Sequence, residues 1–319
     1  MTDNEARASS AATANPAQPR APSLTIVIAS LDPGPVIFEC LAALETQRTD
    51  EVEILVVDAS HDDTAERVRR GFPAARVIRA PDARSLPRLR GLGMAEARAP
   101  FVGVLDAWCL VNTGWVADAL RVQRERPELV AGGGVELAPT ERQSIVAWAT
   151  YLFDYWEFVP PFASGSVGVL PGNNILYKRA ALPEALALRT VGFWKAFTNA
   201  RLKASGHGLW ASAGLGVCIR RRLPLGRFFR SRYHHGRSYA AMRVESQPWV
   251  ARLKWVLITP GLPLLFMARQ LRALVSKPVA RGWFVVCAPL LIAMHVSWAW
   301  GELAGYLAGA GGSHNAIRS

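Results

Sequence analysis

The second half of this 319-residue chain has almost no acidic residues. Residues 1–157 hold 22 acids and 16 bases, whereas residues 158–319 hold 3 acids and 21 bases. The formal charge is therefore −6 for the first half and +18 for the second. This split argues against a uniformly basic nucleic-acid-binding chain. It predicts a soluble domain joined to a part that binds an anionic surface.

Paired cysteines and a secretion signal are also missing. The four cysteines, Cys40, Cys109, Cys218 and Cys287, form no Cys-x-x-Cys pair, which excludes the usual zinc spacings and predicts ordinary thiols in a reducing compartment. Residues 1–22 are rich in Ala, Ser, Thr, Asn and Pro and have no apolar core. They predict a disordered tail rather than a signal peptide, so we expect the bulk of the protein in the cytoplasm.

Three short apolar runs, at residues 24–29, 53–57 and 101–105, have the unbroken pattern of strands buried on both faces of a parallel sheet. The segments between and after them show helical spacing. Helices are predicted over 35–47, 62–70, 85–97 and 114–123, and further along over 148–158 and 193–204. Alternating strands and helices predict an α/β fold. The first strand-to-helix turn lacks Gly-x-Gly-x-x-Gly, which argues against a dinucleotide site.

Two uncharged stretches lie near the C-terminus. Residues 282–301 reach the roughly 20 residues that span a bilayer, whereas residues 255–268 are short for a span and contain two prolines. Basic residues between them favour the cytoplasmic side. We therefore predict a membrane-associated segment over 246–310, with 255–268 interfacial or re-entrant and 282–301 transmembrane. Residues 311–319 are expected to be a flexible C-terminus. The alternative is that 282–301 forms a buried core helix.

An acid follows each of the first three predicted strands: Asp32, Asp58 and Asp106. In open α/β sheets, ligands bind at the carboxyl ends of the strands. Ser60 and Asp62 also lie here, and their simplest interpretation is as caps of the next helix.

Longer strings extend this pattern. IVIASLDPG, EILVVDASHDDTAERV and PRLRGLGMAEARAPFVGVLDAWCLVNTGW are followed by VAGGGVEL, PGNNILYKRAAL and YHHGRSYAAMR. In this order and spacing they resemble a family 2 glycosyltransferase, over roughly residues 23–245. The resemblance implies a GT-A fold, which is a Rossmann-like nucleotide-binding sheet with helices on both faces. It also implies a nucleotide-sugar half over 23–128, an acceptor half over 129–245, and C-terminal membrane-associated helices.

The resemblance also implies roles for particular residues. The nucleotide sugar would be bound by Ala29, Ser30, Asp58, Arg88, Gly91, Asp106, His234, His235 and Arg237. The acceptor side would include Gly172, Asn173, Asn174 and Trp194, because amides can bond sugar hydroxyls. For Gly172 to Asn174, a turn held by the Asn side chains is an equally good interpretation.

One departure from the family pattern concerns the metal. The family's Asp-x-Asp reads Asp106-Ala107-Trp108 here, so Asp106 alone remains as a ligand for Mg²⁺ or Mn²⁺. One carboxylate would bind such an ion weakly, because hard cations need several oxygen ligands. Nearby basic groups would be the alternative partners of the leaving diphosphate.

A second departure concerns the catalytic base. Inverting transfer needs a group that accepts the proton of the acceptor hydroxyl. The family's acidic position reads Phe193-Trp194-Lys195, and a lysine with an ordinary pKa of about 10.4 is protonated at neutral pH. The sequence does not choose among the other candidates, which are Glu136, Asp154, Glu157, His234 and His235.

Residues 220–243 contain eight arginines and no acid. Within this arginine tract, residues 220–222 are expected to contact anionic lipid. His234, His235 and Arg237 are expected to reach a diphosphate. No aromatic stacking platform accompanies the tract, so nucleic acid is not an expected partner.

Together these patterns predict a glycosyltransferase anchored at the cytoplasmic face of the inner (plasma) membrane. It would move a sugar from a nucleotide-sugar donor to a lipid-linked or glycan acceptor by inverting displacement, in the synthesis of a cell-envelope polysaccharide. The second hypothesis is a catalytically degenerate relative that binds nucleotide sugar, or a partner enzyme, without turnover. Trp108 and Lys195, at positions that are usually acidic, motivate that alternative.

Overall fold

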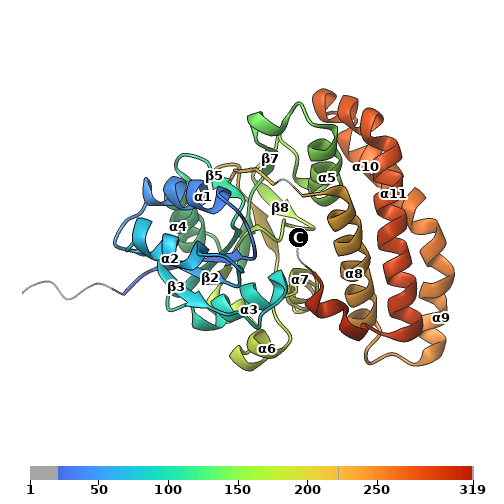
Figure 1. The fold of residues 1–319 in the computed structure, drawn as a ribbon, viewed down its shortest axis with the longest axis horizontal. Helices are drawn as coiled ribbons and strands as arrows, with labels where there is room; N and C mark the ends of the chain where they lie inside the picture. The colour runs from blue at the N-terminus through green and yellow to red at the C-terminus, as the bar shows by residue number, and fades with distance from the viewer. Residues whose placement is uncertain (1–20, 222, 318–319) are drawn as a thin grey trace, which may run out of the picture.

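The computed structural model describes residues 21–221 and 223–317, so nearly all of the tail predicted for residues 1–22 lies outside the described residues. A mixed α/β domain stands on one side of the molecule, and a layer of C-terminal helices stands against it on the other (Figure 1). An eight-stranded sheet with the order β3-β2-β1-β4-β9-β6-β10-β8 forms the centre of the domain. A three-stranded sheet with the order β5-β11-β7 lies beside it.

The first half supplies the parallel core of the large sheet. Its elements are β1 (Leu24–Ser30), α1 (Val36–Glu45), β2 (Val52–Asp58), α2 (Thr64–Gly71), β3 (Arg76–Arg79), α3 (Leu86–Glu96), β4 (Phe101–Asp106), β5 (Cys109–Val111) and α4 (Trp115–Glu125). The three predicted strands and the helices between them are confirmed, with ends that differ by a few residues. Every residue of β1 is buried, which is why these strands read as continuous apolar runs.

The register of these strands brings their carboxyl ends together. β1 pairs in parallel with β2 and with β4, so that Ser30 lies opposite Asp58 and Ala29 lies opposite Asp106. The chain therefore turns outward from all three strands at one edge of the sheet, where ligands bind in open α/β folds.

The second half completes the same sheet. Its elements are β6 (Val130–Gly132), β7 (Val135–Leu137), η1 (Pro139–Glu141), α5 (Ile145–Tyr155), η2 (Trp156–Phe158), β8 (Gly165–Val167), β9 (Asn174–Lys178), η3 (Arg179–Ala181), α6 (Ala185–Thr190), α7 (Lys195–Ala204), β10 (Leu209–Ala211) and β11 (Val217–Ile219). β9 runs antiparallel between β4 and β6, so the predicted halves share one sheet. These strands were not predicted from the sequence, because most of them have only three residues, which are too few to show a period.

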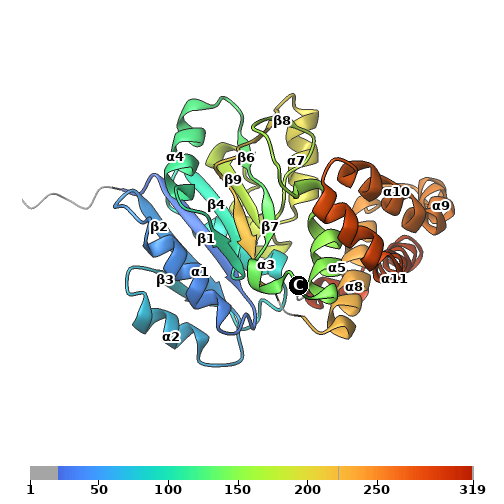
Figure 2. The ribbon, with the colours of Figure 1, turned by 90° about the horizontal axis from the view of Figure 1, so that it is seen from above.

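The C-terminal layer consists of α8 (Leu225–Arg243), α9 (Trp249–Ile258), η4 (Thr259–Gly261), α10 (Leu262–Leu274) and α11 (Pro278–Ala308). α8 packs along α11, α9 lies on the outer side of α11, and α10 reaches back to α5 and η2 of the sheet domain (Figures 1 and 2). Two helical stretches, Trp249–Leu274 and Pro278–Ala308, are long and apolar enough to cross a membrane.

Glycines let α8 and α11 approach closely. A Cβ at Gly301 would overlap the carbonyl oxygen of Tyr233, and one at Gly305 would overlap the carbonyl oxygen of Arg237. Gly236, on the α8 side, meets the carbonyl of Trp298 in the same way. The two backbones therefore pack against each other without side chains between them, and α8 and α11 behave as one unit.

Both ends of α11 contact the sheet domain. Near its start, the indole of Trp283 stacks on Trp148 of α5 with ring centroids 5.3 Å apart. Just before the helix, the Lys277 ammonium donates a hydrogen bond to the carbonyl of Val159. Beyond the other end, the carbonyl of Ile317 accepts a hydrogen bond from the backbone N–H of Leu86 in α3. α11 therefore lies along the domain and does not project from it.

The flexible C-terminus expected for residues 311–319 is not what the structure shows over its described residues. Residues Gly311–Asn315 form the 3₁₀ turn η5, in which the Ser313 hydroxyl is hydrogen-bonded to His234. The Ile317 side chain is buried, and the ring of His314 meets Trp194 edge-on. The segment is held because these side chains bury surface against the domain, which a polar, Gly-rich sequence did not suggest.

The glycine contact between α8 and α11 yields a prediction with a matched control. Gly301→Ala should destabilise the protein by about 1–3 kcal/mol, because the new methyl group overlaps the backbone of α8. Gly282→Ala lies in the same helix but in open space, and it should be neutral or stabilising by up to about 1 kcal/mol. Denaturation of the purified variants in detergent would measure both. Equal effects of the two substitutions would contradict the close packing.

Candidate functional site

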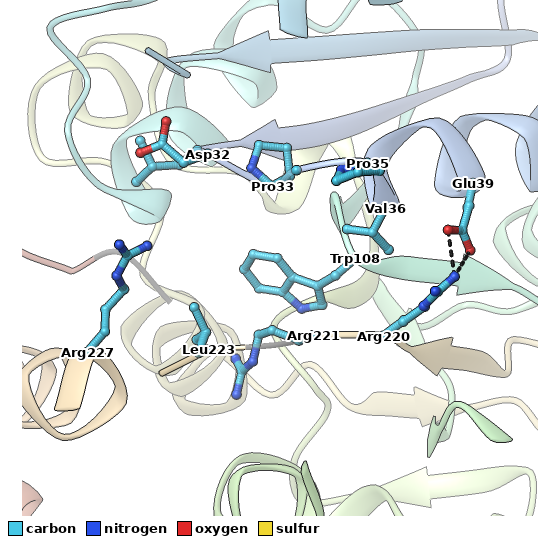
Figure 3. A pocket seen from close by; sticks show the side chains of 12 residues that line it. Asp32, Pro33, Pro35, Val36, Glu39, Trp108, Arg220, Arg221, Leu223 and Arg227 are labelled. Carbon is cyan, nitrogen blue, oxygen red and sulfur yellow. Dashed lines mark hydrogen bonds and ion pairs between the residues drawn. The ribbon is translucent and has the colours of Figure 1, made fainter. Parts of the chain in front are cut away.

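Two cavities of about 430 Å³ each open at the carboxyl ends of β1 and β4. The outer cavity is lined by the turn after β1 and by the chain that leads into α8. Its lining side chains come from Leu31, Asp32, Pro33, Pro35, Val36, Glu39, Trp108, Arg220, Arg221, Leu223 and Arg227, together with Gly34. Figure 3 shows the indole of Trp108 in the middle of this group, with Arg221 beside it.

The inner cavity lies between the sheet domain and the helical layer. The sheet domain contributes Arg90, Asp106, Asp154, Glu157, Asn173, Trp194 and Lys195 among its lining residues. The helical layer contributes Arg232, His235, Tyr239, Phe266, Arg269, His295 and Trp298. Arg221 lines both cavities, so the two spaces adjoin.

Asp106 is the acid at the end of β4, and Arg90 of α3 binds it through both carboxylate oxygens. The Arg90 guanidinium donates from Nε to Oδ1 at 2.9 Å, and from Nη2 to both oxygens at 2.6 Å. The Asp106 side chain is only 2% exposed. Burial disfavours the charge of Arg90, but attraction and hydrogen bonds from Asp106 outweigh burial and keep the Arg90 pKa above its ordinary value.

A second buried ion cluster joins α5 to α8. Asp154 accepts hydrogen bonds from Arg221 at 2.6 Å and from Arg232 at 2.8 Å. Burial alone would raise the Asp154 pKa, but Arg232 and Arg221 outweigh it and hold that pKa below its ordinary value. Two guanidiniums share this one carboxylate, so the trio keeps an excess positive charge at the junction of the cavities.

Glu157 and Lys195 are two oppositely charged side chains that line the inner cavity, and each affects the pKa of the other. Burial lowers the pKa of Lys195 to about 8, although Glu157 opposes the shift. Lys195 Nζ donates to the carbonyl of Leu170 at 2.6 Å. Partial desolvation raises the pKa of Glu157, against the attraction of Lys195 and Arg269. Glu157 is thus a carboxylate with a raised pKa at a cavity wall, as is typical of general bases.

Several polar atoms of the cavity walls have no hydrogen-bond partner within the part of the chain that the structure describes. They are Trp108 Nε1, Asn173 Oδ1, Trp194 Nε1 and His235 Nδ1. The side chains of Trp108, Asn173 and Trp194 are almost fully buried. Burying a polar group without a partner is unfavourable, so these atoms favour a polar ligand in the cavities.

Of the predicted nucleotide-sugar residues, Ala29, Ser30 and Asp58 lie beneath the cavities. None of them lines either cavity as the described residues form it. The Asp58 carboxylate accepts hydrogen bonds from the hydroxyls of Ser30 and Ser60 at 2.6 Å each, and Arg79 also binds it. In this structure Asp58 ties the ends of β1, β2 and β3 together.

The predicted roles of Arg88 and Gly91 do not match their places in α3. The Arg88 guanidinium donates to the carbonyl of Thr190, on the side away from the inner cavity. Gly91 is where α3 meets Leu188 and Gly192, so it serves close packing. Arg90 faces the cavity instead, and sequence reasoning missed it. The signal was present, because a buried strand-end carboxylate needs a cation and α3 supplies Arg90.

The two histidines and the arginine predicted to share one site are separated by the helical period of α8. His235 lines the inner cavity, where burial and Arg232 lower its pKa to about 3. His234 Nδ1 instead lies 3.0 Å from the Ser313 hydroxyl, and Arg237 Nε donates to the carbonyl of Gly309. His234 and Arg237 therefore hold the C-terminal segment in place.

Some of the predicted acceptor-side residues and base candidates line the inner cavity, and others do not. Asn173, Gly172 and Trp194 line the inner cavity, whereas Asn174 is structural because its amide accepts from Trp115 and donates to Leu215. Glu136 lies in a different groove, paired with Arg142, which removes it from the base candidates.

The arginine tract is not uniformly directed at lipid. Arg220 pairs with Glu39 across the outer cavity, and Arg221 pairs with Asp154, so both belong to the candidate site. Arg222 lies outside the described residues, and the expected lipid contact of residues 220–222 stays a prediction. The sequence could not show the two ion pairs, because Glu39 and Asp154 are 181 and 67 residues away along the chain.

A divalent ion does not fit the residues at Asp106. Within residues 21–221 and 223–317, no group of three or more His, Cys, Asp or Glu side chains is arranged to hold a metal ion. Arg90 occupies both oxygens of Asp106, and the indole of Trp108 cannot act as a ligand oxygen.

Comparison with known proteins bears on the fold and the chemistry. A sequence model described as Glycosyl transferase family 2 matches residues 25–185. Among solved structures, a mannosyltransferase from Pyrobaculum calidifontis, PcManGT, was determined with GDP-Man and Mn²⁺. It has a TM-score of 0.53 and 16% identity to this chain, and the match covers 90% of this chain and 88% of that one. This likeness confirms the GT-A fold. No curated protein matches the chain.

The ion pair of Arg90 and Asp106 predicts a large effect of a single substitution. Arg90→Met should destabilise the protein by about 3–5 kcal/mol, because it leaves a buried carboxylate uncompensated. Arg88→Met, on the outer side of the same helix, should have an effect below about 1 kcal/mol. Adding Asp106→Asn to Arg90→Met should recover most of the loss, since no buried charge remains. Chemical denaturation of the four proteins measures this. Similar losses for Arg88→Met and Arg90→Met would contradict the assignment.

Proposed function

Because the chain belongs to glycosyl transferase family 2, we propose that it transfers a sugar from a nucleotide-sugar donor to a lipid-linked acceptor at the cytoplasmic face of the plasma membrane. The product would be a precursor of a cell-envelope polysaccharide. One observation carries the proposal. The inner cavity runs from the strand-end acid Asp106 to Phe266 and Trp298, which belong to the apolar helices.

The outer cavity suits the nucleotide part of the donor. It lies at the end of β1 and is lined by the cations Arg220, Arg221 and Arg227. The inner cavity would then hold the sugar, because Arg221 lines both spaces and marks the place of the diphosphate between them. GDP-mannose is the first donor to test, since the structural neighbour PcManGT binds GDP-Man.

Glu157 is the best-placed general base. Asp154 is committed to two arginines, and a pKa of about 3 makes His235 a poor proton acceptor at neutral pH. In the proposed step, the acceptor hydroxyl oxygen attacks the anomeric carbon and its proton passes to Glu157. The bond from that carbon to the diphosphate oxygen breaks, and the nucleoside diphosphate leaves. This single displacement inverts the anomeric configuration.

The helical layer supplies the proposed membrane contact. Large apolar side chains are exposed along its outer helices, among them Trp249, Leu253, Leu257, Leu264, Leu271, Val285, Ile292 and Trp300. Lys254, Arg269, Arg272 and Arg281 are exposed on the same helices, and residues 246–301 contain no acid. An apolar face bordered by cations is complementary to an anionic lipid monolayer, with about 1 kcal/mol for each basic residue near the surface.

The packing favours helices that lie in the membrane interface over the spanning segment expected at 282–301. A spanning helix would carry one end about 30 Å away from the cytoplasmic domain. Here both ends of α11 contact that domain, through Trp283 and through the residues up to Ile317. α8, with its arginines, lies against α11 and would have to enter the bilayer as well. We therefore propose in-plane attachment.

The transfer reaction is tested in membranes with radiolabelled GDP-, UDP- and dTDP-sugars and a lipid extract. Labelled lipid should appear with one donor. Glu157→Gln should lower the rate by about 10²–10⁴-fold, because the amide cannot accept a proton. Glu136→Gln, in a separate groove, is the matched control and should keep the wild-type rate. Donor binding without transfer for any donor would favour the degenerate binding protein instead.

Charge around Glu157 predicts a shift in the pH profile. A base must be ionised to act, so the rate should fall as the pH drops through the raised pKa of Glu157. Lys195 lowers that pKa, so Lys195→Met should raise it further and move the acid limb to higher pH. Rates from pH 4 to 9 would be compared with those of Lys203→Met, an exposed control. An acid limb unmoved by Lys195→Met would argue against Glu157.

Attachment is tested with vesicles. Leu257→Glu together with Leu264→Glu should abolish flotation with vesicles that contain phosphatidylglycerol, because charges on the exposed face oppose insertion. Alkaline carbonate should release the wild-type protein from native membranes, as expected of an in-plane protein. Retention after carbonate would indicate a spanning helix.

A further inference from the structure

We propose that this protein holds the diphosphate of its donor without a divalent ion, through Arg221 and the indole N–H of Trp108. The inference rests on the proposed nucleotide-sugar donor and concerns how the same site binds it. Three features of the site support it: the Asp106 carboxylate is occupied, Trp108 at the second ligand position is a hydrogen-bond donor, and the cavities carry surplus positive charge.

Asp106 is already fully engaged. Arg90 donates hydrogen bonds to both oxygens of Asp106, and in the wall of the inner cavity the Arg90 and Asp106 side chains are 17% and 2% exposed. A divalent ion could bind Asp106 only by displacing Arg90. That would leave a buried guanidinium without its counterion, next to two more positive charges.

Trp108 occupies the position where a second carboxylate would serve as a metal ligand. A carboxylate binds cations, whereas an indole N–H binds hydrogen-bond acceptors. The indole N–H only donates hydrogen bonds. The Trp108 side chain lies almost fully buried in the wall of the outer cavity, yet its Nε1 has no hydrogen-bond partner among residues 21–221 and 223–317. A phosphate oxygen is an acceptor that would satisfy it. The change from carboxylate to indole thus replaces a site for a cation with a site for the anion itself.

The positive charge comes from the cluster of Asp154, Arg221 and Arg232. One carboxylate faces two guanidiniums, so the cluster carries surplus positive charge. Arg221 uses only Nη2 on Asp154, and its guanidinium centre lies 5.5 Å from the Trp108 ring. Arginine binds phosphate through two parallel N–H groups. Arg221 and Trp108 can therefore contact one diphosphate at the junction of the cavities.

Other acids of the outer cavity do not offer an alternative metal site. Asp32 is hydrogen-bonded to His61, and Glu39 is paired with Arg220. When the bond to the anomeric carbon breaks, its electron pair stays on the phosphate oxygen. Hydrogen bonds from Arg221 and Trp108 would stabilise that charge, which is the task that a metal ion performs elsewhere.

The test is calorimetric titration of the full-length protein in detergent with GDP and UDP, in EDTA and then with Mn²⁺. The nucleoside diphosphate that binds should bind with the same Kd, within about twofold, in both conditions. Arg221→Gln should weaken that binding by about tenfold or more, in line with the loss of a charged hydrogen bond. Arg70→Gln, on the surface helix α2, is the matched control and should bind normally.

Because Arg221→Gln also disturbs the buried cluster, Trp108→Phe provides a second, gentler variant. It keeps an aromatic side chain and removes the N–H, so diphosphate binding should weaken by about tenfold while binding of the bare nucleoside stays unchanged. Binding that requires Mn²⁺ would overturn this inference and leave the proposed function standing. Unaltered diphosphate affinity in Trp108→Phe and Arg221→Gln would overturn it too. If neither nucleotide bound in either condition, the donor-based function itself would fail.

Discussion

The ion pair between Arg90 and Asp106 is the interaction on which the site depends. It fastens helix α3 to the end of β4, and it places a neutral, fully bonded pair where the fold would otherwise present an open carboxylate. The same helix also contributes to the wall of the inner cavity, since the carbonyl of Pro87 accepts a hydrogen bond from the backbone N–H of Phe193, next to Trp194. This buried pair thus removes the negative charge of Asp106 from the cavity wall, so the surplus positive charge of the Asp154 cluster decides the sign that a ligand meets.

The charge asymmetry of the sequence has two separate causes in the folded molecule. Part of the surplus positive charge lies inside, where Arg220, Arg221 and Arg232 pair with acids of the first half. The rest is exposed on the outer helices, at residues such as Lys254 and Arg272. The basic residues of the second half therefore belong to two different features, the candidate anion site and the exposed helical surface. The sequence composition alone does not distinguish them, whereas the three-dimensional structure does.

The fold was largely predictable from the sequence, and the site only in part. β1, β2 and β4 are buried on both faces, so their apolar runs were visible without any partner. Asp106, Asn173, Trp194 and Glu157 were identified and do line the inner cavity. Arg90, Arg221 and Arg232 were not assigned to it, because α3 offers two arginines and residues 220–243 offer eight, and because Asp154 lies 67 and 78 residues from Arg221 and Arg232. Which of these faces inward depends on helix rotation, and tertiary packing decides that.

The last described residues of the chain have a consequence for how the protein is made. His314 packs on Trp194, and Ile317 is hydrogen-bonded to α3, so the segment after α11 is part of the wall around the candidate site. These residues are synthesised after every strand of the sheet and after α8 to α11. The site can therefore be completed only after the apolar helices have been made, and by then these helices are already free to meet a membrane. Shortening the chain to its sheet domain would not yield a smaller soluble enzyme; it would remove the helices and the tail that enclose the cavity.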